Sequence, residues 1–507
     1  MEQRLALEIM LAGESVMLTG PAGSGKTYVL NEFVRYAKKA GKKVSVTATT
    51  GLAATHLNGT TIHAWSGIGI LDELPKQHVE NITDSRRDII EKTDVLIIDE
   101  ISMLHDYRLD MVDETLRQIR KADVPFGGLQ VILCGDFFQL PPVNRGDSRE
   151  GSFVVNSRVW QELDPVICYL TEQHRQDDSS FLDILNALRA GDIRRRHAET
   201  LLARVGTELA STQPITELHT TNINVDSING TRLREIEGDS HEYYMETTGK
   251  TNYVESLKRS CLALETLMLK QGALVMCIRN NPERQYVNGS LGVVVDFEEG
   301  TDYPIVELRS GRKVVMRPET WELRDGDKKR ASLSQVPLRL AWAITVHKSQ
   351  GMTLDAARID LRKAFVPGMG YVALSRVKRL DTLSLAGINT MALRVSDEAL
   401  TIDKKLREKS AADAQKFAHL AEAAQHRAEE PTPPAKAPNA WSEKLERMRE
   451  TYPNAYKPWS KIDDARLQKL FNDGKKLPEL TEVFGRHPGS IKKRLQKHFG
   501  DDVAIPS

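Results

Sequence analysis

The stretch that decides the fold is Gly20-Pro-Ala-Gly-Ser-Gly25-Lys26-Thr27, which matches the pattern G-x-x-x-x-G-K-[ST]. A short apolar run at residues 15–19 precedes it, and helical periodicity follows over residues 26–40. Strand, glycine-rich turn and helix in this order form a phosphate-binding loop, in which backbone N–H groups turn toward phosphate oxygens. We predict nucleotide binding by Gly20, Gly23, Gly25, Lys26 and Thr27.

The residue types of the loop divide the chemistry between them. The Lys26 ammonium suits the β- and γ-phosphates, and the Thr27 hydroxyl suits Mg²⁺. Asp99-Glu100 directly follow an apolar run at residues 95–98, and ligands of parallel α/β sheets bind at the carboxyl ends of strands. Asp99 would hold Mg²⁺ through water, and Glu100 would polarise the attacking water. The two motifs together predict NTP hydrolysis, although a chance glycine turn and an ordinary acidic strand end are the alternatives.

Apolar runs alternate with helical segments through the rest of the chain, which is typical of a parallel sheet covered on both faces. We predict a doubly wound α/β domain over 1–164 and a second α/β domain over 165–278 and 336–400. Residues 279–335 differ, because short β-branched runs there are separated by Asn288-Gly289, Glu299-Gly300 and Ser310-Gly311. This pattern predicts a small antiparallel barrel inserted into the second domain.

The totals exclude some classes of protein. The 507 residues carry 70 Lys+Arg and 70 Asp+Glu, so a globally polycationic coat protein is excluded, whereas a local basic channel is compatible with this balance. No run approaches the ~20 apolar residues of a membrane span. Residues 1–13 carry no secretion signal, and the four cysteines form no CxxC pair. We expect a monomeric, cytoplasmic protein.

Further motifs carry a family resemblance. In chain order they are Thr47-Ala-Thr-Thr-Gly51-Leu-Ala-Ala54, Thr61-Ile-His63-Ala-Trp65, Gly135-Asp-Phe-Phe-Gln139-Leu-Pro-Pro-Val143, Thr345-Val-His347-Lys-Ser349-Gln350-Gly351-Met-Thr353-Leu-Asp355 and Tyr371-Val-Ala-Leu-Ser375-Arg376. Over residues 1–400 the chain resembles superfamily-1B helicases, most closely the Pif-type ("petite integration frequency") DNA helicases, which are relatives of RecD. Residues 99–120 resemble a signature of the same family.

The resemblance implies a fold and an activity. It implies two RecA-like domains with ATP and Mg²⁺ between them, and single-stranded DNA across their tops. It implies an ATP-dependent, nucleoid-associated DNA helicase that moves 5′→3′ and unwinds duplex, forked or structured DNA. Spacing and composition do not themselves show the polarity. It also implies that the 279–335 barrel is SH3-like and that a small strand-separating wedge lies near 68–90, where a plain connecting loop is the alternative.

The resemblance also implies roles for single residues. Gln139 is similar to the γ-phosphate sensor, Arg175 and Arg376 to two arginines from the second domain, Gln3 to the adenine-reading glutamine, and Gly351 to a nucleotide-binding position. An always-charged planar guanidinium suits spread-out phosphoryl charge, although either arginine also fits a surface ion pair. The positions similar to DNA contacts are Thr50, Gly51, His63, Thr345, His347 and Ser349. Trp65 fits either base stacking or a core position.

The chain beyond residue 400 lies outside the resemblance. We predict a solvated helical connector and a Pro-rich linker over 401–440, and a small helix-turn-helix-like domain over 441–507. Its expected core is Leu480, Val483, Phe484, Ile491 and Leu495. Lys492, Lys493, Arg494 and Lys497 are expected to face outward and meet DNA phosphates. A protein-interaction bundle or a purely structural bundle is the alternative.

Three other functions are alternatives to helicase activity. A translocase could move on single strands without unwinding them. An ATP-switched DNA-binding regulator is a different class, and it does not need two sets of hydrolysis motifs. A small-molecule kinase would not need the segments at 345–355 and 371–376. The sequence shows no carboxylate cluster suited to a two-metal nuclease.

Overall fold

The structure is a computed structural model of the chain, and it describes residues 1–56, 59–69, 71–144, 149–172, 178–209, 214–221, 225–281, 285–286, 288–325, 328–421, 451–454 and 461–499. The chain forms two compact units, Met1–Ala428 and Glu429–Ser507. In the described part of the chain, no helix is long and apolar enough to cross a lipid bilayer.

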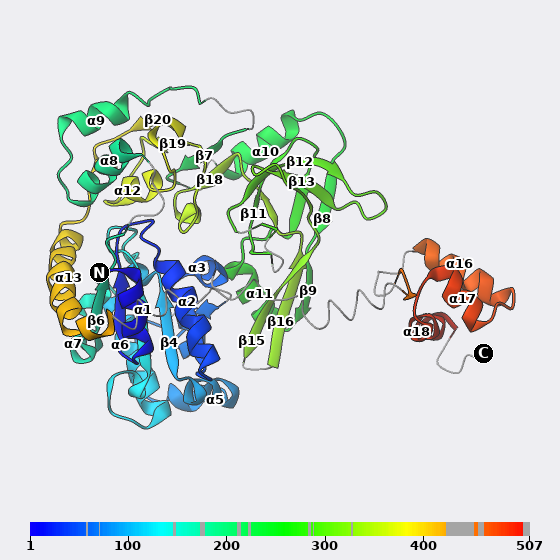
Figure 1. The fold of residues 1–507 in the computed structure, drawn as a ribbon, viewed down its shortest axis with the longest axis horizontal. Coiled ribbons are helices and arrows are strands. Elements are labelled where there is room, and N and C mark those ends of the chain that lie inside the picture. Colours follow the sequence, from blue (N-terminus) through cyan, green and yellow to red (C-terminus); the bar gives the residue numbers. More distant parts are fainter. Residues whose placement is uncertain are drawn as a thin grey trace. The chain divides into compact units, whose positions relative to one another are not determined.

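A six-stranded parallel sheet forms the first α/β domain (Figure 1). Its order is β3 (Thr60–Thr61), β2 (Val44–Ala48), β4 (Val95–Asp99), β5 (Gln130–Cys134), β1 (Val16–Thr19) and β6 (Val166–Tyr169). Leu133 of β5 pairs with Met17 of β1 on one side and with Ile98 of β4 on the other. The carboxyl ends of these three strands therefore meet at one edge of the sheet, where the P-loop and the acidic pair begin.

Helices cover both faces of this sheet because successive strand residues point to opposite sides. Val16 and Leu18 pack with α1 (Gln3–Leu11) and α2 (Lys26–Lys39), whereas Met17 packs in the cluster that contains α6 (Asp106–Arg120). The other helices are α3 (Gly51–His56), α4 (Ile62–Ser66), α5 (Asp84–Lys92) and α7 (Arg158–Leu163). The predicted doubly wound domain is confirmed, but its predicted end at 164 is too early, because β6 pairs with β1.

A second parallel sheet forms the second α/β domain. Its order is β18 (Ala343–Thr345), β7 (Thr216–His219), β19 (Ala357–Leu361) and β20 (Leu383–Ile388). Its helices are α8 (Ser179–Arg189), α9 (Arg195–Leu202), α10 (Val225–Glu235) and α12 (Met369–Leu374). Two parallel-sheet domains are therefore present, and the second is interrupted between β7 and β18 by the inserted region.

The inserted region is antiparallel, as predicted, but larger than 279–335. A five-stranded sheet has the order β14 (Lys313–Val315), β13 (Pro304–Leu308), β12 (Leu291–Phe297), β11 (Leu274–Cys277) and β17 (Leu338–Leu340). Two smaller sheets hold β15 (Glu319–Asp325), β16 (Lys328–Gln335), β9 (Glu246–Gly249), β10 (Thr266–Leu269) and β8 (His241–Tyr244), and α11 (Thr251–Ser260) lies among these strands in sequence.

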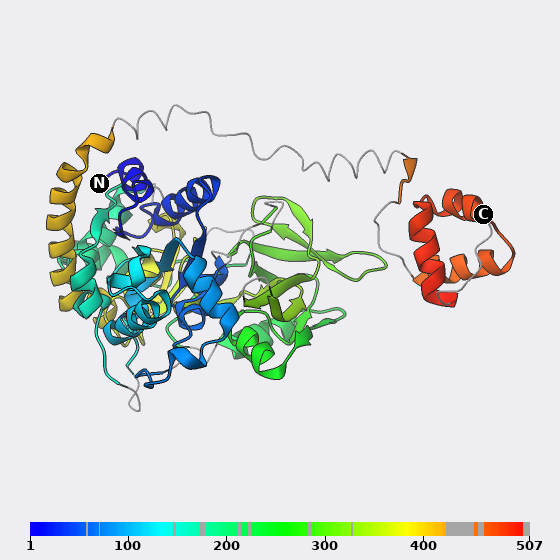
Figure 2. The same ribbon diagram turned by 90° about the horizontal axis from the view of Figure 1, so that it is seen from below.

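The insertion limits were predicted wrongly because a short apolar run does not reveal its partner. β11 and β17 lie outside 279–335, yet Val275 pairs with Leu340 and extends the antiparallel sheet. Antiparallel structure thus runs from His241 to Leu340. Figures 1 and 2 show this region beside the α/β domains, on the side away from α13 (Asp397–Lys416). Its SH3-like classification stays a prediction.

Helix α13 is not the solvated connector that we predicted from residue 401. It packs along β6, the edge strand of the first sheet (Figure 1). The Ile167 N–H donates to Asp413 Oδ2 (2.8 Å), and the Tyr169 N–H donates to Ser410 Oγ (3.1 Å). The prediction failed because these polar residues satisfy edge-strand amides that would otherwise be unpaired. Residues 422–440 of the predicted connector and linker lie outside the described ranges.

The second unit contains α16 (Lys461–Asn472), α17 (Leu477–Phe484) and α18 (Pro488–Phe499). Its core is Leu467, Leu480, Phe484, Ile491 and Leu495. The predicted core residue Val483 is instead exposed, and α17 ends at Gly485 with φ 55°, in the left-handed region that favours glycine. Arg494, which we expected to face outward, forms a bidentate pair with Asp464. The side chains of Lys493 and Lys497 are outside what the structure describes.

Candidate active site

The P-loop has a backbone that requires glycine. Gly20, Gly23 and Gly25 have φ values of 146°, 89° and 84°, which residues with a Cβ rarely adopt. A Cβ on Gly20 would lie 2.6 Å from the Leu170 carbonyl oxygen. Gly25 immediately precedes α2, so the loop ends at a helix N-terminus, where backbone N–H groups favour anions.

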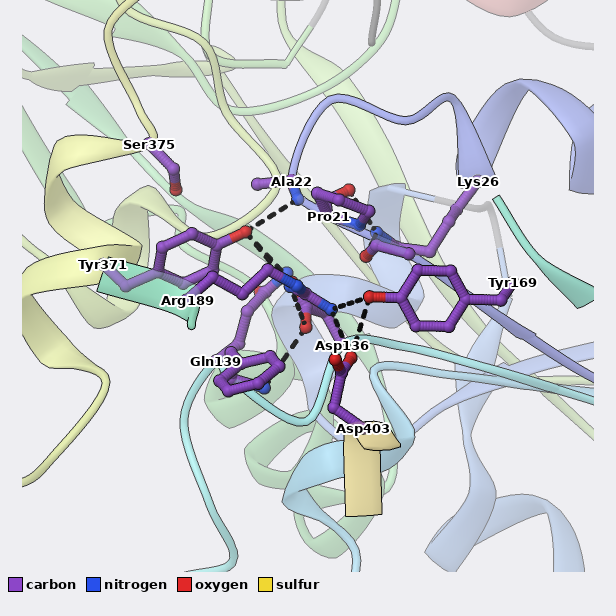
Figure 3. A network of polar contacts seen from close by, with 12 residues as sticks. Pro21, Ala22, Lys26, Asp136, Gln139, Tyr169, Arg189, Tyr371, Ser375 and Asp403 are labelled. Carbon is purple, nitrogen blue, oxygen red and sulfur yellow. Dashed lines mark hydrogen bonds and ion pairs between the residues drawn. The ribbon is translucent and has the colours of Figure 1, made fainter. Parts of the chain in front are cut away.

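Lys26 lies half-buried beneath this loop (Figure 3). Its Nζ donates to the carbonyl oxygens of Gly20 (2.8 Å) and Pro21 (3.0 Å). Burial lowers the pKa of the Lys26 ammonium from its ordinary value, and the nearby Asp136 carboxylate acts against this shift. The ammonium is thus tied to loop carbonyls, with which phosphate oxygens would compete.

A cleft of about 430 Å³ brings most of the predicted catalytic set together. Its lining includes the predicted residues Gly23, Gly25, Lys26, Thr27, Asp99, Glu100, Gln139, Gly351 and Arg376. The second domain also supplies Thr353, Asp355 and Lys378, which we had not singled out. Residues of both α/β domains therefore face one cleft, as a nucleotide sandwiched between domains requires.

The acidic pair ends β4 in an unusual conformation. Glu100 has φ 53°, in the left-handed region, and its N–H donates to Asp99 Oδ1 (2.9 Å). Burial raises the pKa of Asp99. Burial, with the neighbouring Asp99 charge as a second cause, raises the pKa of Glu100 to about 7. A carboxylate with a pKa in this range suits general-base work near neutral pH.

Arg376 lies fully inside the protein at the second-domain wall of the cleft. Its Nε donates to the Val372 carbonyl (2.9 Å), and its Nη2 donates to Ser375 Oγ (2.9 Å). This placement excludes the surface ion-pair alternative for Arg376. Arg175 lies outside the described residues.

Gln3 contacts the P-loop backbone. Its Nε2 donates to the Ser24 carbonyl (2.9 Å), and its own N–H donates to Glu172 Oε1 (3.2 Å). A Cβ on Gly25 would lie 2.2 Å from Gln3 Nε2, so the two residues are packed closely. The adenine-reading role of Gln3 stays a prediction.

The predicted DNA contacts fall into two groups. Thr50, Gly51, His63 and His347 are partly exposed, and burial lowers the pKa of His63 to about 4, which keeps this imidazole neutral at physiological pH. Thr345 and Ser349 are buried. Thr345 Oγ1 accepts from the Lys348 N–H, and Ser349 Oγ donates to the Val346 carbonyl. The Thr345 hydroxyl keeps its own proton to donate, whereas the Ser349 hydroxyl donates inside the turn. Phosphate contact by either residue stays a prediction.

Trp65 and the predicted wedge segment are each anchored to the body of the first domain. Trp65 is buried in the hydrophobic core, so the core alternative replaces base stacking. In the loop after Gly69, Asp72 Oδ1 accepts from Tyr107 Oη (2.9 Å) and from Arg108 Nη2 (2.8 Å), which ties the loop to α6. A role in strand separation stays a prediction.

A buried polar network around Arg189 was missed from the sequence (Figure 3). Arg189 Nη1 donates to Asp136 Oδ1 (2.7 Å) and Oδ2 (2.8 Å), and also to Tyr371 Oη (3.2 Å). Arg189 Nη2 donates to Tyr169 Oη (3.0 Å) and to Asp403 Oδ1 (3.2 Å). One guanidinium thus joins the first domain, the second domain and α13.

The same network reaches the P-loop. The Ala22 N–H donates to Tyr371 Oη (3.0 Å), so a residue of the second domain holds the loop directly. Asp136 and Tyr371 stood within motifs already recognised, whereas Arg189 had no signal beyond a basic residue near a helix end. Gln350 was also missed as a site residue, although its motif was quoted. Its Nε2 donates to Glu100 Oε2 (2.9 Å) and Gln139 Oε1 (3.0 Å).

Comparisons with known proteins agree with this architecture. The family model of PIF1-like helicase matches residues 2–199, and that of the DNA helicase Pif1 2B domain matches residues 252–297. The chain is 41% identical to the ATP-dependent DNA helicase Pif1 of Psychrobacter over 476 residues, covering 82% of this chain and 72% of that relative. It is 36% identical to the human ATP-dependent DNA helicase PIF1, covering 80% of this chain and 63% of the relative.

Solved structures are similar as well. Pif1 of Bacteroides in complex with ADP-AlF4 has a TM-score of 0.70 at 31% identity, covering 81% of this chain and 97% of that one. Pif1 of Bacteroides with ADP-AlF3 and single-stranded DNA has a TM-score of 0.61 at 33% identity, covering 82% and 98%. On this identity and coverage, the chain belongs to the PIF1-like helicase family, an enzyme family of ATP-dependent DNA helicases.

Proposed function

We propose that this chain is an ATP-dependent DNA helicase that moves 5′→3′ along single-stranded DNA and separates duplex or forked DNA. The observation that carries the proposal is the cleft in which Lys26 and Glu100 of one domain face Arg376 of the other. A nucleotide held there would contact both domains, so its hydrolysis would change how they pack. The resemblance to superfamily-1B motifs supports the direction of movement.

The cleft residues fit ATP with Mg²⁺. The Thr27 hydroxyl and the Asp99 carboxylate line the same cleft and are hard oxygen donors, which Mg²⁺ prefers together with phosphate oxygens and water. The ion would neutralise charge on the phosphates. In this proposal Glu100 orients a water, and Arg376 and Lys26 balance negative charge.

Strand displacement tests this proposal. Forked substrates with only a 5′ or only a 3′ single-stranded tail would be incubated with the full chain, ATP and Mg²⁺. We expect ATP-dependent separation of the 5′-tailed fork alone. Separation of the 3′-tailed fork would contradict the polarity. DNA-stimulated ATPase without separation of either fork would instead indicate a translocase that does not unwind.

A further inference from the structure

Glu100 is held at two points, once from each α/β domain. In the first domain, Thr49 Oγ1 donates to the Glu100 carbonyl oxygen (2.9 Å), and the Thr49 N–H donates to the Asp99 carbonyl (3.2 Å). In the second domain, Gln350 Nε2 donates to the Glu100 carboxylate (2.9 Å). The left-handed backbone of Glu100 and its carboxylate are therefore both fixed by side chains outside β4.

Each of these side chains adjoins a segment proposed to carry DNA. Thr49 precedes Thr50 and Gly51, which are partly exposed at the start of α3. Gln350 directly follows the short helix His347–Ser349, and its N–H donates to the His347 carbonyl (3.3 Å). A strand bound on these two segments would lie one residue away from both groups that hold Glu100.

The hydrogen bonds from Gln350 restrict Glu100 and Gln139, the two residues predicted to take part in hydrolysis. The Gln350 amide nitrogen donates to Glu100 Oε2 and to Gln139 Oε1 (3.0 Å) at once, so base and sensor are bridged by one side chain. An ionised carboxylate only accepts hydrogen bonds, so an oxygen engaged by Gln350 has less capacity for an attacking water. The bridge is buried, since Gln350 is 8% exposed and Gln139 is 7% exposed.

We propose that Gln350, assisted by Thr49, is a positioning residue that holds Glu100 and Gln139 in a resting arrangement until single-stranded DNA binds the adjoining segments. DNA on the 347–349 turn shifts Gln350 and frees the carboxylate, so strand occupancy is coupled to hydrolysis. This inference rests on the proposed function. It assigns the coupling to one amide side chain and one hydroxyl.

The test measures ATPase kcat of the full chain with and without saturating oligo-dT, for wild type, Gln350→Ala and Gln350→Met. Methionine keeps the length of the side chain but donates no hydrogen bond. We expect the DNA-free kcat to rise about fivefold to tenfold in both variants, since a hydrogen bond to a charged group is worth about 1.5–3 kcal/mol and some of it is replaced by water. The ratio of DNA-stimulated to DNA-free kcat should fall accordingly.

A merely structural or purely catalytic role would not raise the DNA-free rate. A DNA-free kcat at or below the wild-type value in both folded variants would therefore overturn the proposal. Thr49→Val, which keeps the shape but removes the donor, should shift the DNA-free kcat in the same direction. Gln130→Ala is the matched control, because that side chain donates to the Met10 and Glu14 carbonyls at the opposite end of β5 and should leave both rates unchanged.

The result also separates this inference from the proposed function. Wild-type ATPase that does not respond to oligo-dT would contradict the helicase proposal itself. Wild-type ATPase that is stimulated, together with variants that keep the wild-type rates, would contradict only the role of Gln350.

Discussion

Two positively charged side chains, Lys26 and Arg376, decide which chemistry the cleft can perform. Lys26 and Arg376 lie on walls supplied by different domains; Arg376 is buried and Lys26 is half-buried. Lys26 is tied to loop carbonyls and Arg376 to carbonyls and a hydroxyl of its own domain. Each cation is thus satisfied within its domain and presented to the same cleft.

Lys26→Ala removes the ammonium that would contact the β- and γ-phosphates. We expect DNA-stimulated ATPase to be lost while DNA binding stays measurable, because the predicted DNA contacts lie on segments other than the P-loop. A coupled ATPase assay and fluorescence anisotropy with labelled oligo-dT would measure the two properties. ATP turnover at the wild-type rate would contradict the assignment of Lys26 to nucleotide binding.

Arg376→Ala removes the cation from the second-domain wall. We expect ATP binding to persist and kcat to fall by about 10³-fold or more, the range of arginine fingers in related NTPases. Arg362→Ala is a control, since its exposed guanidinium pairs with Asp360 elsewhere in the same domain. Wild-type rates in Arg376→Ala would remove this residue from the transition state.

At the scale of elements, α13 completes the first sheet. Asp413 and Ser410 accept from the N–H groups of Ile167 and Tyr169, two residues apart on β6, while the Val166 N–H donates to the Ser15 carbonyl on the β1 side. A helix from the end of the α/β unit thereby covers an edge strand that would otherwise be open to pairing with another chain.

Asp413→Ala should destabilise the first unit by about 1–3 kcal/mol, because it leaves the buried Ile167 N–H without an acceptor. Chemical denaturation followed by circular dichroism would measure the loss. Glu408→Ala changes an exposed acidic residue of the same helix and should have little effect. Equal stability of the two variants would mean that α13 does not support β6.

Arg189→Met should lower the free energy of unfolding by about 3–5 kcal/mol, because it leaves the buried Asp136 carboxylate without its cation. The double variant Arg189→Met with Asp136→Asn should recover part of this loss, because no unpaired charge then remains buried at this pair. A double-mutant cycle in denaturant would measure the coupling energy. Additive losses would show that the pair does not act as a unit.

The whole chain divides into a motor unit, Met1–Ala428, which contains the cleft, and a small helical unit, Glu429–Ser507. The second unit has its own apolar core of residues from α16, α17 and α18. The Arg494–Asp464 pair uses one of the predicted DNA-facing cations. The helix-turn-helix classification of this unit stays a prediction. Its recruitment of DNA or of a protein partner stays a proposal.

Deletion of residues 431–507 should leave ATPase and unwinding rates intact, since the cleft lies entirely within Met1–Ala428. If the second unit contacts duplex phosphates, the deletion should weaken DNA affinity and flatten its salt dependence. Titrations of a labelled fork at several salt concentrations would measure both. Loss of ATPase would show that the second unit belongs to the motor.

Contiguous sequence patterns are enough to predict the local parts of the site. The strand, glycine turn and helix around Lys26, the acidic pair after β4 and the order of the motifs are contiguous patterns. Such patterns are specified by spacing and backbone needs within a few residues, so the nucleotide-binding residues and the α/β class could be predicted without coordinates.

The contacts that those parts make with distant segments follow from the folded chain and not from local patterns. Gln350 contacts Glu100 across 250 residues of chain, and Arg189 contacts Asp136 across the two domains. Helix α13 packs against β6 and is not a solvated connector. The limits of the antiparallel insertion were settled in the same way, by β11 pairing with β17. The hydrophobic periodicity of a segment indicates that one of its faces is buried. It does not indicate which distant segment covers that face.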